Sequence, residues 1–361
     1  MTSVAEHLDP SVVGEAASPQ RHPIEWWYAN VQIEAPGAPI HGMTLISIFS
    51  KFDGVIEEHR RVIISPEGGI FADFGSGPLT RDSIRASATS MDVTLGRNRM
   101  RGAYPSYTLD VDGEASSGAR IEAHLDYTAD VTEAREGYIG NQLKHWVIYR
   151  ADAKGTIRVG DETYDVTGLG YMEHLYGTLG WLEPYLGEVK PPTFVEGWNW
   201  YWSPAAGPSG VVVQAGGFIR DGEAVPFASI CADGREHHLF VTGTIDVLER
   251  RTYDGVSYTH KFRLTDSNPA GSVDITITRL PAAQRAIKTA PGGSKVAFIT
   301  GYVSLAGTVT IDGVEHDVTS PAFGSVFTVS LAGPMLAARE LPAAIRVPFG
   351  RLLRAAQQLR K

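Results

Sequence analysis

The stretch IEAHLDY, residues 121–127, decides the fold class, because apolar or aromatic residues at odd positions alternate with polar ones at even positions. Successive side chains of a β-strand point to opposite faces of a sheet, so this alternation predicts a strand with one buried face. The stretch VDITIT, residues 273–278, repeats the pattern. Further strands are expected at Met43–Phe52, Arg61–Ile64, Met91–Leu95, Tyr107–Val111, His145–Arg150, Val211–Ile219, Leu239–Ile245, Tyr258–Leu264 and Val296–Leu305.

Asp-Gly pairs recur between these stretches and supply the left-handed conformations that tight hairpins need. They stand at residues 53–54, 112–113, 221–222, 233–234, 254–255 and 312–313. Many short strands joined by such turns predict an all-β protein built from antiparallel barrels or sandwiches. Regular helix is expected only at the C-terminal end.

An internal repeat divides the chain. GTIRV at 155–159 is similar to GTVTI at 307–311, and DVT at 165–167 recurs at 317–319, both at an offset of 152 residues. This favours two copies of one β unit, with a boundary within Leu186–Val195. The expected parts are a flexible N-terminus, two β domains and a basic C-terminal helix, at residues 1–20, 21–188, 195–330 and 334–361 respectively.

The composition is that of an ordinary globular protein, with 43 % hydrophobic and 20 % charged residues in a chain of 361. A net charge of −9 argues against nucleic acid as a partner. The single cysteine, Cys231, is interpreted as a buried small residue. Residues 1–20 have no apolar signal-peptide core, and no stretch has the length of a membrane-spanning helix. We therefore expect a cytoplasmic protein.

The stretch 334–361 has an amphipathic pattern. Apolar residues recur at helical spacing (Phe349, Leu352, Leu353, Ala356 and Leu359), together with basic residues (Arg346, Arg351, Arg354, Arg360 and Lys361). One interpretation is a helix docked on the second β domain. The other is a peripheral contact with anionic lipid on the inner face of the membrane.

Two aromatic runs open the two halves: EWWY at 25–28 and WNWYW at 198–202. Core packing is one interpretation of these rings. The other is a ring-lined site, since aromatic faces bind polyenes and stabilise carbocations by about 0.5–2 kcal/mol per contact. The candidate substrate-binding residues in the two runs are Trp26, Trp27, Tyr28, Trp198, Trp200, Tyr201 and Trp202.

The stretch GLGYMEHLYG, residues 168–177, holds the strongest catalytic candidate. Its repeat partner is SPAFGSV at 320–326, which keeps an aromatic residue opposite Tyr171 but has Ser and Val opposite Glu173 and His174. The ionisable pair is therefore not required by the repeated scaffold. This contrast places the expected active site in the first half of the chain.

On an extended strand, Tyr171 and Glu173 share a face and His174 points away. Enclosure in an apolar, aromatic cavity penalises the charged form of a carboxyl group, so Glu173 is expected to stay protonated and to act as a general acid. The alternative is a buried Glu satisfied by a neighbouring His, or a surface ion pair. His145, one expected strand earlier, is a candidate to pair with Glu173 or to receive a proton; a structural role is the alternative.

Other motifs are incomplete. The sequence from Gly168 to Glu173 begins like a dinucleotide-binding fingerprint, but it lacks the third glycine and a following helix. There is neither a G-x-S-x-G motif nor a P-loop, and the histidines lack chelating spacing. We predict no metal and no cofactor.

EWWY at 25–28 and GYMEH at 170–174 resemble the hydroxyneurosporene synthase group, also called carotenoid 1,2-hydratases and AttH-like proteins. The resemblance covers about Arg21–Val329. It implies two tandem lipocalin-like β-barrels. It also implies either a hydratase that protonates a terminal isoprenoid double bond or a pericyclase that folds a polyene for Diels–Alder closure.

The resemblance assigns the hydratase acid to Glu173 and its nearby tyrosine to Tyr171, and it assigns an upstream His and Trp to His145 and Trp146. Two departures bear on the substrate. Glu173-His174-Leu175 stands where Asp-His-Asn is expected, so the acid reaches one methylene further. His145 and Trp146 are adjacent rather than separated by one residue, so one of them is expected to face away from the site.

The leading hypothesis is a cofactor-independent enzyme that protonates a C=C bond of an isoprenoid or polyene, leading to hydration or cyclisation. A pericyclase that only folds its polyene is the first alternative. A non-catalytic carrier of hydrophobic molecules is the second, since a fold does not determine a function.

Overall fold

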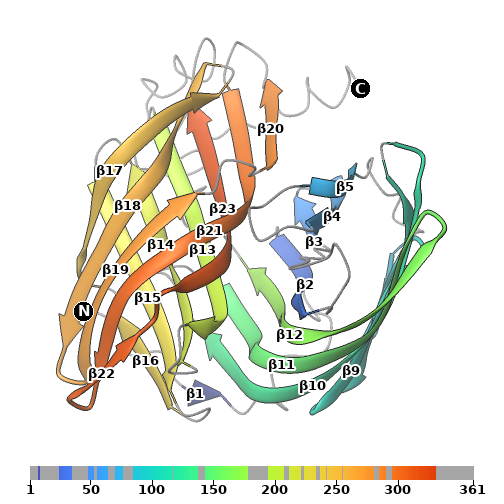
Figure 1. The fold of residues 1–361 in the computed structure, drawn as a ribbon, viewed down its shortest axis with the longest axis horizontal. Helices are drawn as coiled ribbons and strands as arrows, with labels where there is room; N and C mark the ends of the chain where they lie inside the picture. Colours follow the sequence, from blue (N-terminus) through green and yellow to red (C-terminus); the bar gives the residue numbers. More distant parts are fainter. Residues whose placement is uncertain are drawn as a thin grey trace, which may run out of the picture. The chain divides into compact units, whose positions relative to one another are not determined.

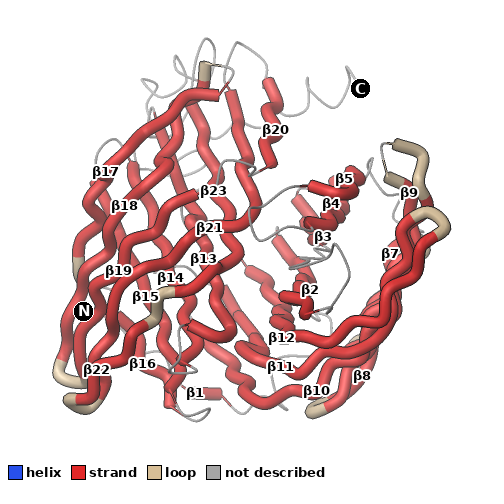
Figure 2. The backbone as a smooth tube through the Cα atoms, in the orientation of Figure 1, coloured by secondary structure: helices blue, strands red, loops and turns tan. Residues whose placement is uncertain are grey.

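All regular structure in the described part of the chain is β-strand, as the red tube in Figure 2 shows. The all-β prediction is therefore confirmed. The computed structural model describes residues 7–8, 24–34, 48–52, 55–63, 70–75, 84–115, 117–136, 143–177, 194–206, 211–220, 223–232, 236–240, 242–253, 255–279, 284–289 and 295–330.

The chain divides into two compact units, residues 1–179 and 180–361. This division precedes the stretch 186–195 in which the sequence analysis places the boundary. The predicted helix at 334–361 lies outside the described residues. Of the predicted flexible stretch 1–20, only His7–Leu8 is described, as strand β1. Within the described part, no helix is long and apolar enough to cross a membrane.

The first unit contains one large antiparallel sheet in the order β2-β12-β11-β10-β9-β8-β7-β6, with β1 paired to β10 (Figure 1). A separate sheet has the order β3-β4-β5. The strands are β2 Ile24–Glu34, β3 Ile48–Phe52, β4 Val55–Ile63, β5 Ile70–Gly75, β6 Ile84–Ala86, β7 Met91–Leu95, β8 Asn98–Ala103, β9 Ser106–Glu114, β10 Arg120–Glu136, β11 Leu143–Val159 and β12 Glu162–Gly177.

The large sheet of the first unit curls (Figure 1), and buried residues from its strands form one hydrophobic core. The register shifts once between Ala129 and Val131 on β10 and again between Ile148 and Ala151 on β11, and such bulges bend strands. Residues 121, 123, 125 and 127 are all buried, whereas His124 and Asp126 are exposed. The alternation predicted from IEAHLDY is thus confirmed.

The second unit has a sheet in the order β16-β15-β14-β13-β23-β21-β19-β18-β17, with β20 and β22 also paired to β21. Its end strands approach each other, since β15 contacts β17 and β16 contacts β18. The strands are β13 Phe194–Ala206, β14 Val211–Arg220, β15 Glu223–Ala232, β16 Glu236–Phe240, β17 Thr244–Tyr253, β18 Val256–Asn268, β19 Gly271–Arg279, β20 Gln284–Thr289, β21 Lys295–Ile311, β22 Val314–Asp317 and β23 Ser320–Ser330.

The internal repeat is confirmed by equivalent strands in the two units. β11 and β21 each have 17 residues, and both of their ends differ by the 152 positions that separate the sequence repeats. Gly155 and Gly307 occupy the same place within them, with φ of +154° and +145°. The turn that follows begins in the left-handed region in both units, at Gly160 with φ of 62° and at Asp312 with φ of 51°.

Two finer predictions are wrong. Asp112-Gly113 lies inside β9 and pairs with β10, because the chain turns at 115–119, where Ala115 N donates to Ala119 O over 2.8 Å. The predicted strand Leu239–Ile245 is two strands, β16 and β17. Thr242 interrupts it, because its backbone N–H and its hydroxyl both donate to the carboxylate of Asp266.

Candidate active site

Strands β2 and β12 lie side by side, and their register brings four polar side chains together. Tyr28 pairs with Glu173, and Asn30 pairs with Tyr171. All four are buried, with exposed fractions between 0 % and 8 %. Because residues two apart on a strand point to the same face, the four form one cluster on the face opposite the core. We call Tyr28, Asn30, Tyr171 and Glu173 the polar tetrad.

The tetrad is connected within each strand and packed between them. The Tyr171 hydroxyl donates to Glu173 Oε2. Asn30 Nδ2 donates to the Tyr28 hydroxyl over 3.1 Å. The Tyr28 and Tyr171 rings meet edge to face, with centroids 5.7 Å apart and an angle of 74°. The Glu173 carboxyl therefore lies beside two aromatic rings, with one oxygen held by a phenol.

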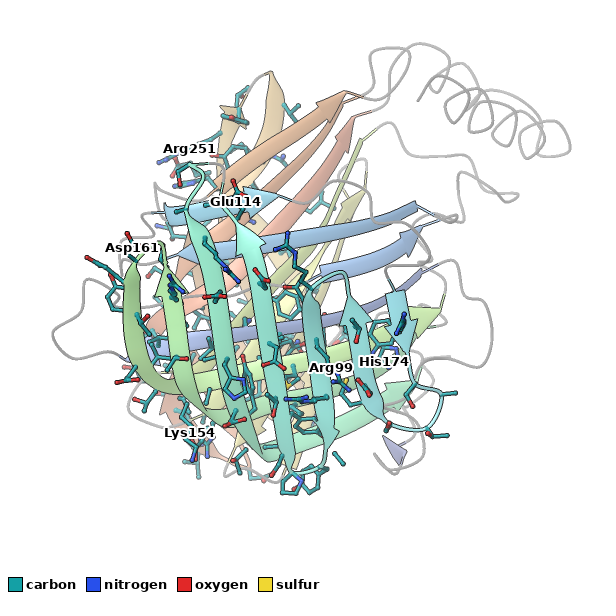
Figure 3. The ribbon with its side chains drawn as sticks, turned by 90° about the vertical axis from the view of Figure 1, so that its right-hand side faces the viewer. Arg99, Glu114, Lys154, Asp161, His174 and Arg251 are labelled. Atoms are coloured by element: carbon teal, nitrogen blue, oxygen red, sulfur yellow. The ribbon has the colours of Figure 1, made fainter. Side chains whose placement is uncertain are left out.

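This burial is local to the β2–β12 edge of the sheet. On β8 to β11, the face opposite the core is solvent-accessible and charged, as Figure 3 shows for Arg99 and Lys154. Arg99, for example, forms a two-pronged ion pair with Asp92, with both N···O distances at 2.8 Å. At residues 27–31 and 170–174, by contrast, both faces are buried. A buried polar group needs a partner, so the tetrad is a specific arrangement rather than a solvated surface.

Trp27 and His174 lie on the core face, away from Glu173. Their rings stack with centroids 4.5 Å apart and an angle of 2°. Because His174 (labelled in Figure 3) stacks on Trp27, it lies on the opposite face of β12 from Glu173, as the strand geometry predicts. The exposed fraction of Glu173 is 6 %, which argues against the surface ion pair, and one of its hydrogen bonds comes from Tyr171. The alternative of a buried Glu that a neighbouring His satisfies stays a prediction.

The Gly168-x-Gly170 pattern is explained by packing. A Cβ on Gly168 would lie 1.9 Å from the backbone oxygen of Gln32, and a Cβ on Gly170 would lie 2.2 Å from the ring of Tyr127. The Tyr127 hydroxyl donates to the backbone oxygen of Asn30 over 3.4 Å. Complete burial raises the pKa of Tyr127, so this hydroxyl stays a neutral donor. The glycines therefore let a core tyrosine support the strand that carries the tetrad.

We expect Gly170→Ala to destabilise the protein by about 1–3 kcal/mol, because the new methyl group overpacks against the buried Tyr127 ring. Denaturant unfolding measures the change. Combining it with Tyr127→Leu tests the cause, since the double variant should cost less than the sum of the two single variants. Unchanged stability in Gly170→Ala would contradict this packing.

The backbone is described for the remaining site candidates, but their side chains are not. His145 pairs with Leu175, and Trp146 pairs with His174. The next residue on β11, Val147, is the cross-strand neighbour of Glu173. On β2, Trp26 pairs with Leu175 of β12. The run Trp198, Trp200, Tyr201 and Trp202 lies within β13. The roles proposed for these residues remain predictions.

The repeat supplies an internal comparison for the tetrad. In the second unit, Trp200 pairs with Ser325 and Trp202 pairs with Phe323, at the positions that Tyr28–Glu173 and Asn30–Tyr171 occupy in the first. The scaffold is thus repeated, while the acid and its polar neighbours stand in the first unit alone at these positions. The sequence analysis did not identify Asn30 as a site residue. Its position two residues after Tyr28 could have indicated it, because the two side chains then share one face of a strand.

Among the described residues, no three His, Cys, Asp or Glu side chains are grouped in a way that could hold a metal ion. The chemistry that the described tetrad offers is proton donation, hydrogen bonding and contact with aromatic rings.

Two solved structures have a similar fold over most of their length. One is an AttH-like protein from Nitrosomonas europaea, with a TM-score of 0.54 and 16 % identity, covering 90 % of this chain and 99 % of that one. The chain has the lipocalin-like fold of AttH proteins. The other is kievitone hydratase from Nectria haematococca, with a TM-score of 0.53 and 12 % identity, covering 89 % of this chain and 90 % of that one.

A third structure, CghA, has a TM-score of 0.41 and 13 % identity, covers 90 % of this chain and 96 % of that one, and carries no argument. No family model matches the sequence, and no curated protein matches it significantly. At such low identities the likeness establishes the fold alone, so the reaction must be argued from the tetrad.

Proposed function

We propose that this protein is a cofactor-independent enzyme of the hydratase or cyclase type, in which Glu173 protonates a C=C bond of an isoprenoid or polyene. The observation that carries the proposal is a buried carboxyl group with the Tyr171 hydroxyl on one oxygen and the Tyr28 and Tyr171 rings beside it. General acid catalysis by a positioned side chain contributes roughly 10²–10⁴-fold to a rate.

The proposed step uses both carboxyl oxygens. Glu173 acts in its protonated form and transfers the proton from Oε1 to one alkene carbon. The π electrons form the new C–H bond, which leaves a carbocation on the neighbouring carbon. The carboxylate that remains accepts the Tyr171 hydrogen bond at Oε2, and charge-assisted hydrogen bonds of this kind are stronger than neutral ones.

The cation is then quenched in one of two ways. Addition of water followed by loss of a proton to Glu173 gives the alcohol and restores the acid, which is net hydration. Attack by another alkene of the same substrate forms a C–C bond and moves the cation, and loss of a proton from a neighbouring carbon to the Glu173 carboxylate gives a ring with a new C=C bond and restores the acid. The electron-rich faces of the tetrad tyrosines stabilise the cationic stage. Kievitone hydratase has a similar fold, so the scaffold is compatible with such chemistry.

The test begins with lipids extracted from the purified protein, which identify candidate substrates by mass spectrometry. Each candidate is then incubated with the protein in heavy water. We expect one deuterium on carbon in every product molecule, because the transferred proton exchanges with solvent between turnovers. Product without carbon-bound deuterium would favour a pericyclase, and a retained but unaltered ligand would favour a carrier.

A further inference from the structure

The strongest unexplained feature of the described chain is the side-chain amide of Asn30. Asn30 has an exposed fraction of 1 %, and its Nδ2 donates to the Tyr28 hydroxyl. Its Oδ1 is fully buried and finds no hydrogen-bond partner among the residues that the structure describes. Buried acceptors in native proteins are almost always paired, so this oxygen calls for an explanation.

A second such atom lies on the same face of β2. Gln32 is two residues further along and half-buried, and its Nε2 is likewise buried without a hydrogen-bond partner in the described part of the chain. Residues two apart on a strand are separated by roughly 7 Å, a span that the Asn and Gln side chains can bridge together with one small polar group. An acceptor, Asn30 Oδ1, and a donor, Gln32 Nε2, therefore belong to successive side chains on the tetrad face of β2.

The complement of this pair is a group that both donates and accepts. An apolar chain satisfies neither amide, and a carboxylate satisfies only the donor. An ether oxygen likewise only accepts. A hydroxyl group donates to Asn30 Oδ1 and accepts from Gln32 Nε2, and so satisfies both atoms.

We infer that the substrate carries a hydroxyl group, which Asn30 Oδ1 and Gln32 Nε2 bind next to Glu173. The substrate class is then an oxygenated isoprenoid or polyene rather than a pure hydrocarbon. This inference rests on the proposed function for the identity of the site. Asn30 is the cross-strand neighbour of Tyr171, so the hydroxyl selects which double bond lies near the acid.

Three probes that share the same carbon skeleton distinguish the contribution of Asn30 to binding from that of Gln32. They are geranylgeraniol, its methyl ether, and the corresponding hydrocarbon without oxygen. Binding is measured by quenching of tryptophan fluorescence. We expect the alcohol to bind about tenfold more tightly than the ether, because only the alcohol donates to Asn30, and the ether to bind more tightly than the hydrocarbon, because only the ether accepts from Gln32. Equal affinity for all three probes would overturn the inference.

Two variants assign these preferences to residues. Asn30→Leu should abolish the preference for alcohol over ether. Gln32→Leu should weaken alcohol and ether alike and leave the hydrocarbon unchanged. Because Gln32 is only half-buried, its variant is expected to fold even if Asn30→Leu does not. A preference for ether over hydrocarbon that survives in Gln32→Leu, or a preference for alcohol over ether that survives in a folded Asn30→Leu, would also overturn the inference.

Glu173→Gln serves as the control that separates this inference from the proposed function. It should retain both binding preferences, because the amide pair is intact, whatever happens to turnover. If the protein prefers the alcohol but its product contains no deuterium, the inferred ligand class stands and the proposed reaction is contradicted. If the product contains deuterium but the three probes bind equally, the proposed reaction stands and the inferred ligand class is contradicted.

Discussion

Replacing Glu173 by Gln is expected to lower the rate of substrate conversion by roughly 10²–10⁴-fold while leaving the protein folded. The amide has nearly the same shape as the acid and keeps an oxygen that accepts from the Tyr171 hydroxyl, so packing in the tetrad is preserved. It cannot deliver a proton to carbon. Single-turnover product formation measures the rate, and the thermal unfolding midpoint checks the fold.

The chain offers a matched control on the same strand. The Tyr164 hydroxyl donates to Glu162 two residues away, just as Tyr171 does to Glu173, but Glu162 is exposed. Glu162→Gln should therefore leave the rate unchanged. A full rate in Glu173→Gln would remove the carboxyl from the mechanism and favour a pericyclase. An equal loss in both variants would show that the effect does not come from the buried position.

Gly155→Ala and Gly307→Ala are each expected to destabilise the protein by roughly 3–5 kcal/mol, which is large for a single methyl group. Both residues have a positive φ that side chains rarely adopt. A Cβ would also lie 1.9 Å from the backbone oxygen of His124 in the first case and 2.1 Å from that of Asp274 in the second. A backbone carbonyl in a sheet cannot move aside without breaking its ladder. Denaturant unfolding measures the loss.

Two turn glycines isolate the steric part of this effect. Gly160 and Gly313 have φ of 62° and 79°, but a Cβ at either position would meet no atom within 4 Å. Gly160→Ala and Gly313→Ala should therefore cost only about 1–2 kcal/mol, from backbone strain alone. If all four variants lower the free energy of unfolding by the same amount, the close approach to the neighbouring strand would not explain the need for glycine at 155 and 307.

Local patterns of the sequence determine which way individual side chains point. The alternation at 121–127 identifies the buried face of β10, because the period of two is a property of any extended chain. The same rule places Tyr171 and Glu173 on one face and His174 on the other. The 152-residue repeat likewise predicts equivalent strands, since similar local sequences form similar elements.

Short turn-like patterns in the sequence do not by themselves determine where the chain turns. Asp112-Gly113 has the composition of a hairpin turn, yet it lies within a strand because its neighbours are paired along β10. The preference of two residues for a turn is small beside the hydrogen bonds and burial of a continuous ladder. The Gly168-x-Gly170 pattern misleads in the same way, since its cause is the close approach of β2 and of the Tyr127 ring.

Only the tertiary structure decides that Tyr28 and Asn30 meet Tyr171 and Glu173. Their strands are more than a hundred residues apart, and their pairing follows from the order and register of the whole sheet. A shift of one residue would turn every side chain of β2 to the opposite face and would place Trp27 where Tyr28 lies. The acid is visible in the sequence; its phenol and amide neighbours across the sheet exist because long-range pairing fixed that register.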